Sequence, residues 1–273
     1  MRIDLHVHTS RYSSCGHATP EEMAQAALDH GLDGIVLTEH NVTWPLDELA
    51  ELRAAFPALT ILSGIELTSD RGDDYLVLGL PRQDWFAPRL PAEEIVQRSQ
   101  RLGGVVILAH PYRYRDDVPE ILFTCPVDGI EVASCNMHGG ASQGAVRLVQ
   151  ALGAFPVWNS DAHHTRDVGL YANVLPGRIA DEVQLAAALA ARTARPFADA
   201  TRISATNAIW REYLPQIRQL IADGVDDPSI RAALSDRVGY SDLYAVRNDL
   251  EVLRPLPPWQ PEPLSMPTHQ GRG

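Results

Sequence analysis

The chain has 273 residues, of which 45% are hydrophobic and 21% are charged, an ordinary composition for a globular protein. Its formal net charge of −12 weighs against binding of long nucleic acid, which normally requires a basic face. There is no apolar run of about 18 residues and no apolar leader at the N-terminus, so we expect a cytoplasmic protein without a membrane span. The three cysteines then indicate buried thiols or metal ligands more than disulfides.

Strand and helix patterns alternate along the first two thirds of the chain. A strand over Arg2–His6 precedes a helix over Pro20–His30, for which Thr19 is the expected N-cap and Glu22 completes a capping box. Apolar runs predict further strands at 34–38, 60–62, 74–80, 105–110, 129–134 and 155–164. Further helices are predicted at 46–56, 92–102, 144–152 and 180–191. This alternation favours parallel strands in an α/β fold.

The pattern changes after about Thr201. Helices are predicted at 207–220, 227–234 and 243–253, followed by a proline-rich tail that carries His269. We therefore expect a barrel domain over residues 1–200 and a helical C-terminal extension over residues 201–273. The extension would pack on the barrel or form a contact in a homo-oligomer.

Histidines and acids stand where the predicted strands end. In a barrel the carboxyl ends of the strands meet at one mouth, whereas a doubly wound sheet would spread them along an edge. No G-x-G-x-x-G motif follows the first strand, so a dinucleotide-binding fold has no support. The pattern favours a barrel whose mouth is lined by His6, His8, His40, Glu66, His110, Asp161 and His163.

The spacing of these side chains predicts a metal centre. His6 and His8 are two residues apart in a strand, so both face one side and can bind one ion, with Asp4 behind them as a support. Asp161 and His163 repeat that spacing. Each motif alone could be an incidental polar strand end, but their combination at the ends of apolar strands is hard to explain without a cation.

The motifs D-L-H-V-H-T, T-E-H-N, G-I-E, A-H-P and S-D-A-H occur in this order between Met1 and Ala198. Together they resemble the PHP family, which is named after polymerase and histidinol phosphatase. The resemblance implies a distorted (β/α)7 TIM-like barrel. It also implies two or three divalent ions of zinc, manganese or iron, and hydrolysis of phosphomonoesters or phosphodiesters.

The resemblance also implies the ligands of the first two ions. One ion would be held by His6, His8, Glu66 and Asp161. A second ion would share Glu66 and add His110 together with a residue from 131–138, for which Cys135 is the better match and His138 the competitor.

A third ion would be held by His40, His163 and a residue from the loop after His8. Family members often have S-D-G-x-x-T-P in this loop, and the chain has S-C-G-H-A-T-P. Cys15 therefore stands where the family has aspartate, and His17 is the alternative ligand. Thiolate ligands would favour zinc or iron over manganese.

The expected reaction is attack on phosphorus by a hydroxide that bridges two metal ions. His163 or His164 would protonate the leaving oxygen or orient the phosphate. Arg113 is the first choice for a phosphate contact among the nearby arginines Arg11, Arg113, Arg115 and Arg166. The substrate would be a small phosphorylated molecule or a nucleotide.

Two alternatives stay open at this point. One is an amidohydrolase-type hydrolase acting at a carbon centre, since related barrels carry similar metal clusters. The other is a non-catalytic PHP module, against which the intact set of ligands argues.

Overall fold

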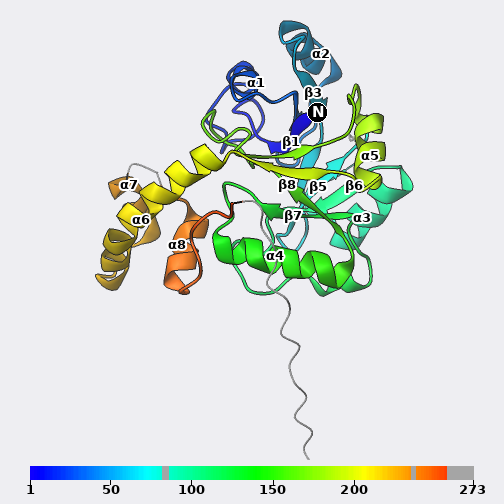
Figure 1. Cartoon of the computed structure of the whole chain (residues 1–273). Coiled ribbons are helices and arrows are strands. Elements are labelled where there is room, and N and C mark those ends of the chain that lie inside the picture. Colours follow the sequence, from blue (N-terminus) through cyan, green and yellow to red (C-terminus); the bar gives the residue numbers. More distant parts are fainter. Residues whose placement is uncertain (82–85, 235–237, 257–273) are drawn as a thin grey trace, which may run out of the picture.

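The computed structural model describes residues 1–81, 86–234 and 238–256. Figure 1 shows strands enclosed by helices, with α6, α7 and α8 gathered on one side. The strands are β1 Arg2–Val7, β2 Gly34–Leu37, β3 Thr60–Ser63, β4 Ile65–Thr68, β5 Asp74–Leu78, β6 Val105–Leu108, β7 Gly129–Ala133, β8 Phe155–Trp158, β9 Tyr171–Val174 and β10 Arg195–Ala198. The helices are α1 Pro20–Asp29, α2 Leu46–Ala55, α3 Ala92–Arg101, α4 Gly139–Leu152, α5 Glu182–Ala190, α6 Ala200–Ala222, α7 Asp227–Ala233 and α8 Tyr240–Arg247, with a 3₁₀ turn at Glu120–Phe123. Within the described ranges, no helix combines the length and the apolar character needed to cross a membrane.

The strands form two five-stranded sheets, in the orders β10-β9-β1-β2-β3 and β4-β5-β6-β7-β8. The neighbours β1, β2 and β3 are parallel, as are β6, β7 and β8. The expectation of parallel strands throughout is wrong, because β9, β10, β4 and β5 pair antiparallel with their neighbours. Residues 69–73, which join β4 to β5, are too few for the crossover of a dozen or more residues that parallel pairing requires.

The two sheets do not close into one barrel through strand ladders in the described part of the chain, so the predicted (β/α)7 barrel is not confirmed. The edge strands β3 and β4 of the two sheets are separated by Gly64 alone. The packing there is tight, since a Cβ atom at position 64 would lie 2.6 Å from Leu78 Cδ2. Where β9 of the first sheet meets β8 of the second, the side-chain amide of Asn173 exchanges two hydrogen bonds with the backbone of Trp158. Isolated bridges also join Val7 to Ala162 and His40 to Glu66, so side chains and single bridges hold the sheets together where ladders do not.

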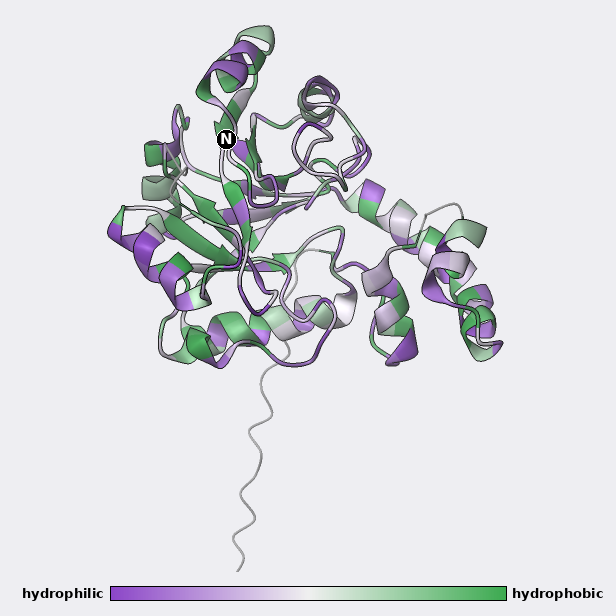
Figure 2. Cartoon of the chain, turned by 180° about the vertical axis from the view of Figure 1, so that it is seen from behind, coloured by the Kyte–Doolittle hydropathy of each residue, from purple (hydrophilic) through white to green (hydrophobic). Residues whose placement is uncertain are grey.

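Apolar side chains from both sheets share one interior core, which includes Ile3, Leu5, Leu76, Leu78, Ile107 and Val157. Helix α5 closes one end of this core through Leu185 and Leu189. Gly79 allows that approach, because its φ is +81° and a Cβ atom would lie 2.4 Å from Ala186 Cβ. Separate apolar clusters pack α1 and α2 on the first sheet and α3 and α4 on the second. In Figure 2 the strands between these helices are accordingly mostly hydrophobic.

Two helix starts show how capping determines a boundary. Helix α1 begins as predicted, with Thr19 and Glu22 forming the capping box. Helix α4 begins at Gly139, five residues before the predicted start, because the ring of His138 accepts a hydrogen bond from the backbone N–H of Ala141. A histidine is an uncommon N-cap, so the sequence pattern did not reveal this boundary.

The C-terminal helices build an apolar cluster of their own around Trp210, Ile217, Ile230 and Leu243. Helix α6 begins at Ala200, earlier than predicted, where Asp199 caps it. Helix α8 ends at Arg247, before the predicted limit of 253. Residues 257–273, which include most of the predicted proline-rich tail and His269, lie outside the described residues. The proposed division at residue 200 stays a prediction.

Candidate metal centre

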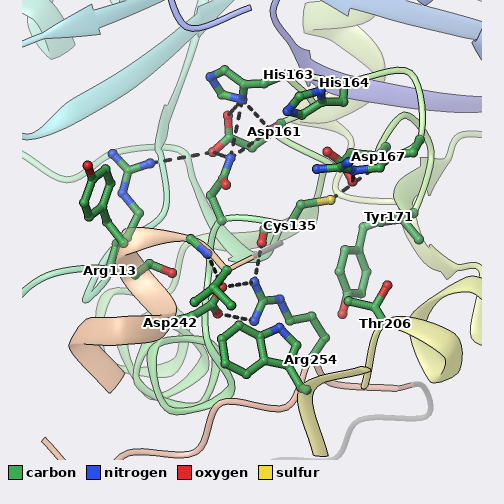
Figure 3. Close-up of a pocket in the computed structure, with 18 of the residues that line it drawn as sticks. Arg113, Cys135, Asp161, His163, His164, Asp167, Tyr171, Thr206, Asp242 and Arg254 are labelled. Atoms are coloured by element: carbon green, nitrogen blue, oxygen red, sulfur yellow. Dashed lines mark hydrogen bonds and ion pairs between the residues drawn. The ribbon is translucent and has the colours of Figure 1, made fainter. Parts of the chain in front are cut away.

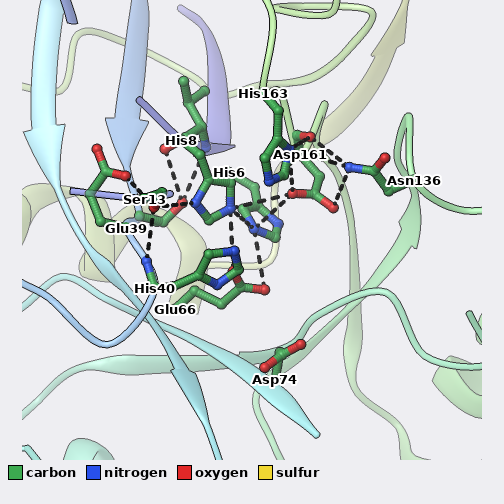
Figure 4. Close-up of polar contacts among 12 residues, drawn as sticks. His6, His8, Ser13, Glu39, His40, Glu66, Asp74, Asn136, Asp161 and His163 are labelled. Carbon is green, nitrogen blue, oxygen red and sulfur yellow. Dashed lines mark hydrogen bonds and ion pairs between the residues drawn. The ribbon is translucent and has the colours of Figure 1, made fainter. Parts of the chain in front are cut away.

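Four of the predicted ligands converge at the ends of β1, β4 and β8, as Figure 4 shows. The Nε2 atoms of His6 and His8 lie 2.9 Å apart. His6 Nε2 lies 3.5 Å from Glu66 Oε1 and 3.3 Å from Asp161 Oδ1. His8 Nε2 lies 3.2 Å from Glu66 Oε2 and 3.4 Å from Asp161 Oδ1. Donor atoms about 2.1 Å from a tetrahedral ion are roughly 3.4 Å apart. The arrangement therefore fits the first predicted ion.

The other nitrogen of each ring is engaged in a way that turns the Nε2 lone pair toward the cluster. His6 Nδ1 lies 3.0 Å from Glu131 Oε1, and His8 Nδ1 lies 3.2 Å from Ser13 Oγ. A ring that donates from Nδ1 keeps Nε2 as an acceptor, which is the form that binds a metal ion.

A second group joins Glu66, His110 and Asp74, whose donor atoms lie within 4.8 Å of one another. His110 Nε2 is 2.9 Å from Glu66 Oε1 and 3.9 Å from Asp74 Oδ2. Asp74 was not among the predicted ligands. Because β5 runs antiparallel to its neighbours, its first residue lies at the edge where the parallel strands end. The available signal was the short β4–β5 connection, which indicates a hairpin.

Neither residue proposed to complete the second set belongs to a group of converging donors among the described residues. The thiol of Cys135 faces the carbonyl oxygen of Asp167 at 3.8 Å. The ring of His138 caps α4 through its Nδ1. The geometry therefore favours Asp74 in the place that Cys135 or His138 was predicted to take.

The third predicted set is represented by His8, His40 and His163, which also place donor atoms within 4.8 Å of one another. The ring of His8 stacks on that of His40 at 4.4 Å and on that of His163 at 4.5 Å. Cys15 lines the same cavity as His40 and His163. Burial would raise the pKa of the Cys15 thiol, but the neighbouring His163 and His40 lower it to about 6, so the thiolate form that binds metals is favoured.

His17, the alternative ligand in this loop, is exposed and stacks on His164 instead. The two ring centroids lie 4.1 Å apart and the rings are nearly parallel, at 4°. His17 is in none of the donor groups found in the described chain. The geometry favours Cys15 over His17 beside the third group.

Glu131 supports the centre from behind and was not predicted as a site residue. Its carboxylate contacts the Nδ1 atom of His6, and it accepts hydrogen bonds from the backbone N–H of His110 at 2.9 Å and from the amide of Asn159 at 2.8 Å. Asn136, also missed, donates at 2.9 Å to Asp161 Oδ2. Such partners orient ligands and tune their affinity for the ion.

Asp4 contacts backbone groups behind His6 and His8, in keeping with the supporting role predicted for it. It accepts hydrogen bonds from the N–H groups of His6, Ser160 and Gly169 at 3.0–3.3 Å. Burial raises the pKa of Asp4 to about 6, although these hydrogen bonds act in the opposite direction. The contacts join β1 to the segment that carries Asp161.

Two of the predicted ligands in the cluster have backbone angles that non-glycine residues rarely adopt. His110 has a φ of +28° and Asp161 a φ of +51°. Such angles persist only where the surrounding structure imposes them, and they gather at functional sites. His110 lies shortly after the buried strand β6 and Asp161 shortly after β8, so the turn in the backbone directs their side chains into the cluster.

The charges of the cluster compensate one another. Burial would raise the pKa values of Glu66 and Asp161, but the surrounding imidazoles, above all His6, hold both well below their usual range. Burial would lower the pKa of His40, but Glu66 and Cys15 raise it to about 11. No hydrogen bond of acceptable geometry reaches Glu66 Oε2 within the described chain, although His40 Nδ1 lies 2.7 Å away. A buried oxygen with nitrogens around it but without a well-aligned donor suits a cation.

Among the four candidate arginines, Arg113 is the one at the cluster. Its guanidinium nitrogens lie 3.7 Å from carboxylate oxygens of Asp161 and Asp74. Arg166 is exposed beside Asp167, whereas Arg11 pairs with Glu48 and Arg115 with Asp73. His163 and His164 line the same cavity as Arg113 (Figure 3).

Fold and site together define an α/β protein with a buried cluster of histidines and carboxylates suited to divalent metal ions. Family models identify the class: residues 4–114 match the PHP domain and residues 140–194 match the PHP-associated family. The chain therefore carries a PHP domain followed by a PHP-associated region.

Several known proteins are similar to this chain in sequence or in fold. The chain is 26% identical over 151 residues to the uncharacterized protein MJ1587 of Methanocaldococcus jannaschii. This match covers 51% of this chain and 85% of that protein. The fold of this chain resembles that of a two-domain protein of Bacteroides vulgatus that contains a predicted PHP-like metal-dependent phosphoesterase. The TM-score is 0.59 and the sequences are 18% identical. The match covers 72% of this chain and 64% of the other. The fold also resembles that of PsfC of Pseudomonas syringae, with a TM-score of 0.55 and 21% identity over 78% of this chain and 98% of the other.

Proposed function

We propose that this protein is a metal-dependent phosphoesterase that hydrolyses phosphomonoesters or phosphodiesters of small molecules or nucleotides. The observation that carries the proposal is the convergence of His6, His8, Glu66 and Asp161, of which Asp161 lines a cavity together with the neighbouring Arg113. The negative net charge of −12 supports a small substrate over long nucleic acid. The donors suit zinc, manganese or iron.

When bound, two or three divalent ions would make water acidic enough to supply hydroxide and would neutralise charge on the phosphate. Their ligands would be His6, His8, His40, Glu66, Asp74, His110, Asp161 and His163, with Cys15 beside the third group.

The chain's own residues account for binding of the phosphate and for proton transfer. Arg113 reaches the edge of the cluster, where its planar guanidinium can donate two parallel hydrogen bonds to phosphate oxygens. His163 is grouped with His8 and His40. We therefore assign protonation of the leaving oxygen to His164, which lines the same cavity.

The test combines metal content with hydrolysis of one phosphomonoester and one phosphodiester, with and without added Mn²⁺ or Zn²⁺. The wild type is compared with His110→Ala and with His30→Ala, a matched control whose ring contacts the Val168 carbonyl outside the cluster. We expect two or three ions per chain and turnover that is lost in His110→Ala alone. A chain that binds no metal would contradict the proposal. Bound metal without phosphoester turnover would favour the carbon-centred alternative.

A further inference from the structure

The cluster opens into a cavity of about 880 Å³ that the C-terminal helices also line. Ligand sites for molecules of drug size measure roughly 300–1,000 Å³, so the space is much larger than a phosphate group needs. In Figure 3, Arg113, Asp161 and His163 lie at one end of this cavity, and Thr206 and Arg254 lie at the other. The far wall is therefore built by α6, α8 and the segment that follows α8.

Apolar side chains that are unusually exposed gather in this cavity. Tyr114 is 49% exposed, Tyr240 is 45% exposed and Ile209 is 38% exposed, and all three line it. Tyr114 follows Arg113 in the loop after β6, Ile209 lies on α6 and Tyr240 begins α8. Large exposed apolar groups in a concave site are a mark of ligand contact. At the helical end these apolar and aromatic side chains lie beside the charged groups of Arg202, Arg231 and Asp242, which line the cavity too, and Arg231 packs over one side of the Tyr240 ring at 4.4 Å.

The helical wall is attached to the metal centre by buried hydrogen bonds. Arg254 pairs with Asp242 at the start of α8 and donates from Nη2 to the carbonyl oxygen of Cys135 at 2.7 Å. Asn207 on α6 exchanges two hydrogen bonds with the backbone of Arg254, at 2.8 and 2.9 Å. Cys135 immediately precedes Asn136, which holds Asp161. The wall is therefore fixed relative to the ligands.

We infer that the C-terminal helical unit, α6–α8, binds the organic group of the substrate and selects phosphate esters whose organic part carries a large ring. This inference rests on the proposed phosphoesterase function and adds to it the class of substrate. The phosphate would lie at the cluster beside Arg113, and the ring would pack against Tyr114, Ile209 and Tyr240. Contacts to the non-reacting part of a substrate raise kcat/KM through binding energy.

The experiment compares adenosine 5′-monophosphate with ribose 5-phosphate on the metal-loaded protein. Both are esters of the same primary hydroxyl, so they differ in the planar base while the scissile bond is matched. If only diesters are hydrolysed, the methyl esters of the same two compounds replace them. We expect kcat/KM to be roughly 5- to 100-fold higher for the adenosine compound, the range that stacking of one base provides.

Variants of the wall separate a binding role from a structural one. We expect Tyr240→Ala and Ile209→Ala to lower kcat/KM for the adenosine compound and to leave that for the ribose compound nearly unchanged. Tyr240→Phe keeps the ring and should keep the preference. Phe123→Ala is the control, because Phe123 is 62% exposed and does not line this cavity. Equal kcat/KM for the two compounds in wild type would overturn the inference.

Equilibrium dialysis of the same two compounds against the same proteins separates this inference from the proposed function. If no ester is hydrolysed, tighter binding of the adenosine compound that is lost in Tyr240→Ala would still support the ring-binding wall, while the phosphoesterase proposal would fail. Turnover of both compounds without preference would leave the phosphoesterase proposal intact and refute the wall.

Discussion

Two buried glutamates at neighbouring strand ends, Glu39 and Glu66, have opposite surroundings, although both are fully buried. Glu39 accepts hydrogen bonds from Thr9 at 2.6 Å, from Ser13 at 2.5 Å and from the Trp44 ring at 3.2 Å. Those donors are neutral, and they satisfy the carboxylate with hydrogen bonds alone.

Glu66, in contrast, is surrounded by four imidazoles within 3.5 Å, those of His6, His8, His40 and His110. Imidazole nitrogens can either donate a proton to a carboxylate or join it in binding a cation. Burial of an acid therefore does not identify a ligand, whereas the chemistry of its neighbours does. Four measurements on variants of these acids and their neighbours test this distinction.

The largest effect is expected for Glu66→Gln. Removal of the shared carboxylate leaves several imidazoles without their counter-charge and removes a donor from two groups. We expect the loss of at least one ion and a loss of turnover greater than the roughly 10- to 100-fold caused by removal of a supporting residue. Metal analysis after dialysis and steady-state kinetics measure both. Retention of all bound metal would show that Glu66 resembles Glu39 after all.

Glu131→Gln should have the next largest effect. Glu131 contacts His6 Nδ1 and accepts from the backbone of His110, so its loss disturbs two ligands without removing a donor atom. We expect metal affinity to fall roughly 10- to 100-fold with the number of ions unchanged at saturation. Competition with a metal-binding dye gives the affinity. A change smaller than twofold would mean that Glu131 serves only packing.

Proton release on metal binding provides a third test. Because the pKa of His40 is raised to about 11, its ring is protonated in the metal-free chain at neutral pH and must lose that proton to become a ligand. Affinity should therefore rise with pH, roughly tenfold per pH unit for each proton released. Calorimetry in buffers of different ionisation enthalpy counts the protons. Glu66→Gln should lower the count, because Glu66 raises this pKa, and Glu39→Gln should leave it unchanged.

Glu39→Gln itself should affect stability more than metal binding. The variant keeps the shape of the side chain but leaves buried donors poorly paired, so we expect the free energy of unfolding to fall by about 1–3 kcal/mol. Urea unfolding of the metal-free protein measures this change. The metal content should match that of the wild type, with a small effect through Ser13, which joins Glu39 to His8. A loss of metal as large as that in Glu66→Gln would abolish the distinction between the two acids.

Local rules predicted part of this structure well. The α1 capping box depends on residues three apart, and the alternation that brings His6 and His8 together depends on residues two apart. The group of Glu66 with His6 and His8 was expected from the family resemblance and is present in the geometry. Strand direction was less accessible, because β9 pairs with the distant β1 and β5 pairs with β6, which follows only after a helix.

The amino-acid sequence by itself determined the alternating elements, the capped helix and the series of histidines and acids at strand ends, because these follow from nearest-neighbour geometry and from motifs along the chain. Only the tertiary structure decided that Asp74 joins the cluster, that His138 caps α4 and that Cys135 faces a carbonyl oxygen. It also decided that the C-terminal helices line the cavity. Each of these outcomes depends on which strands pair, in which direction, and which side chains then meet across long distances in sequence.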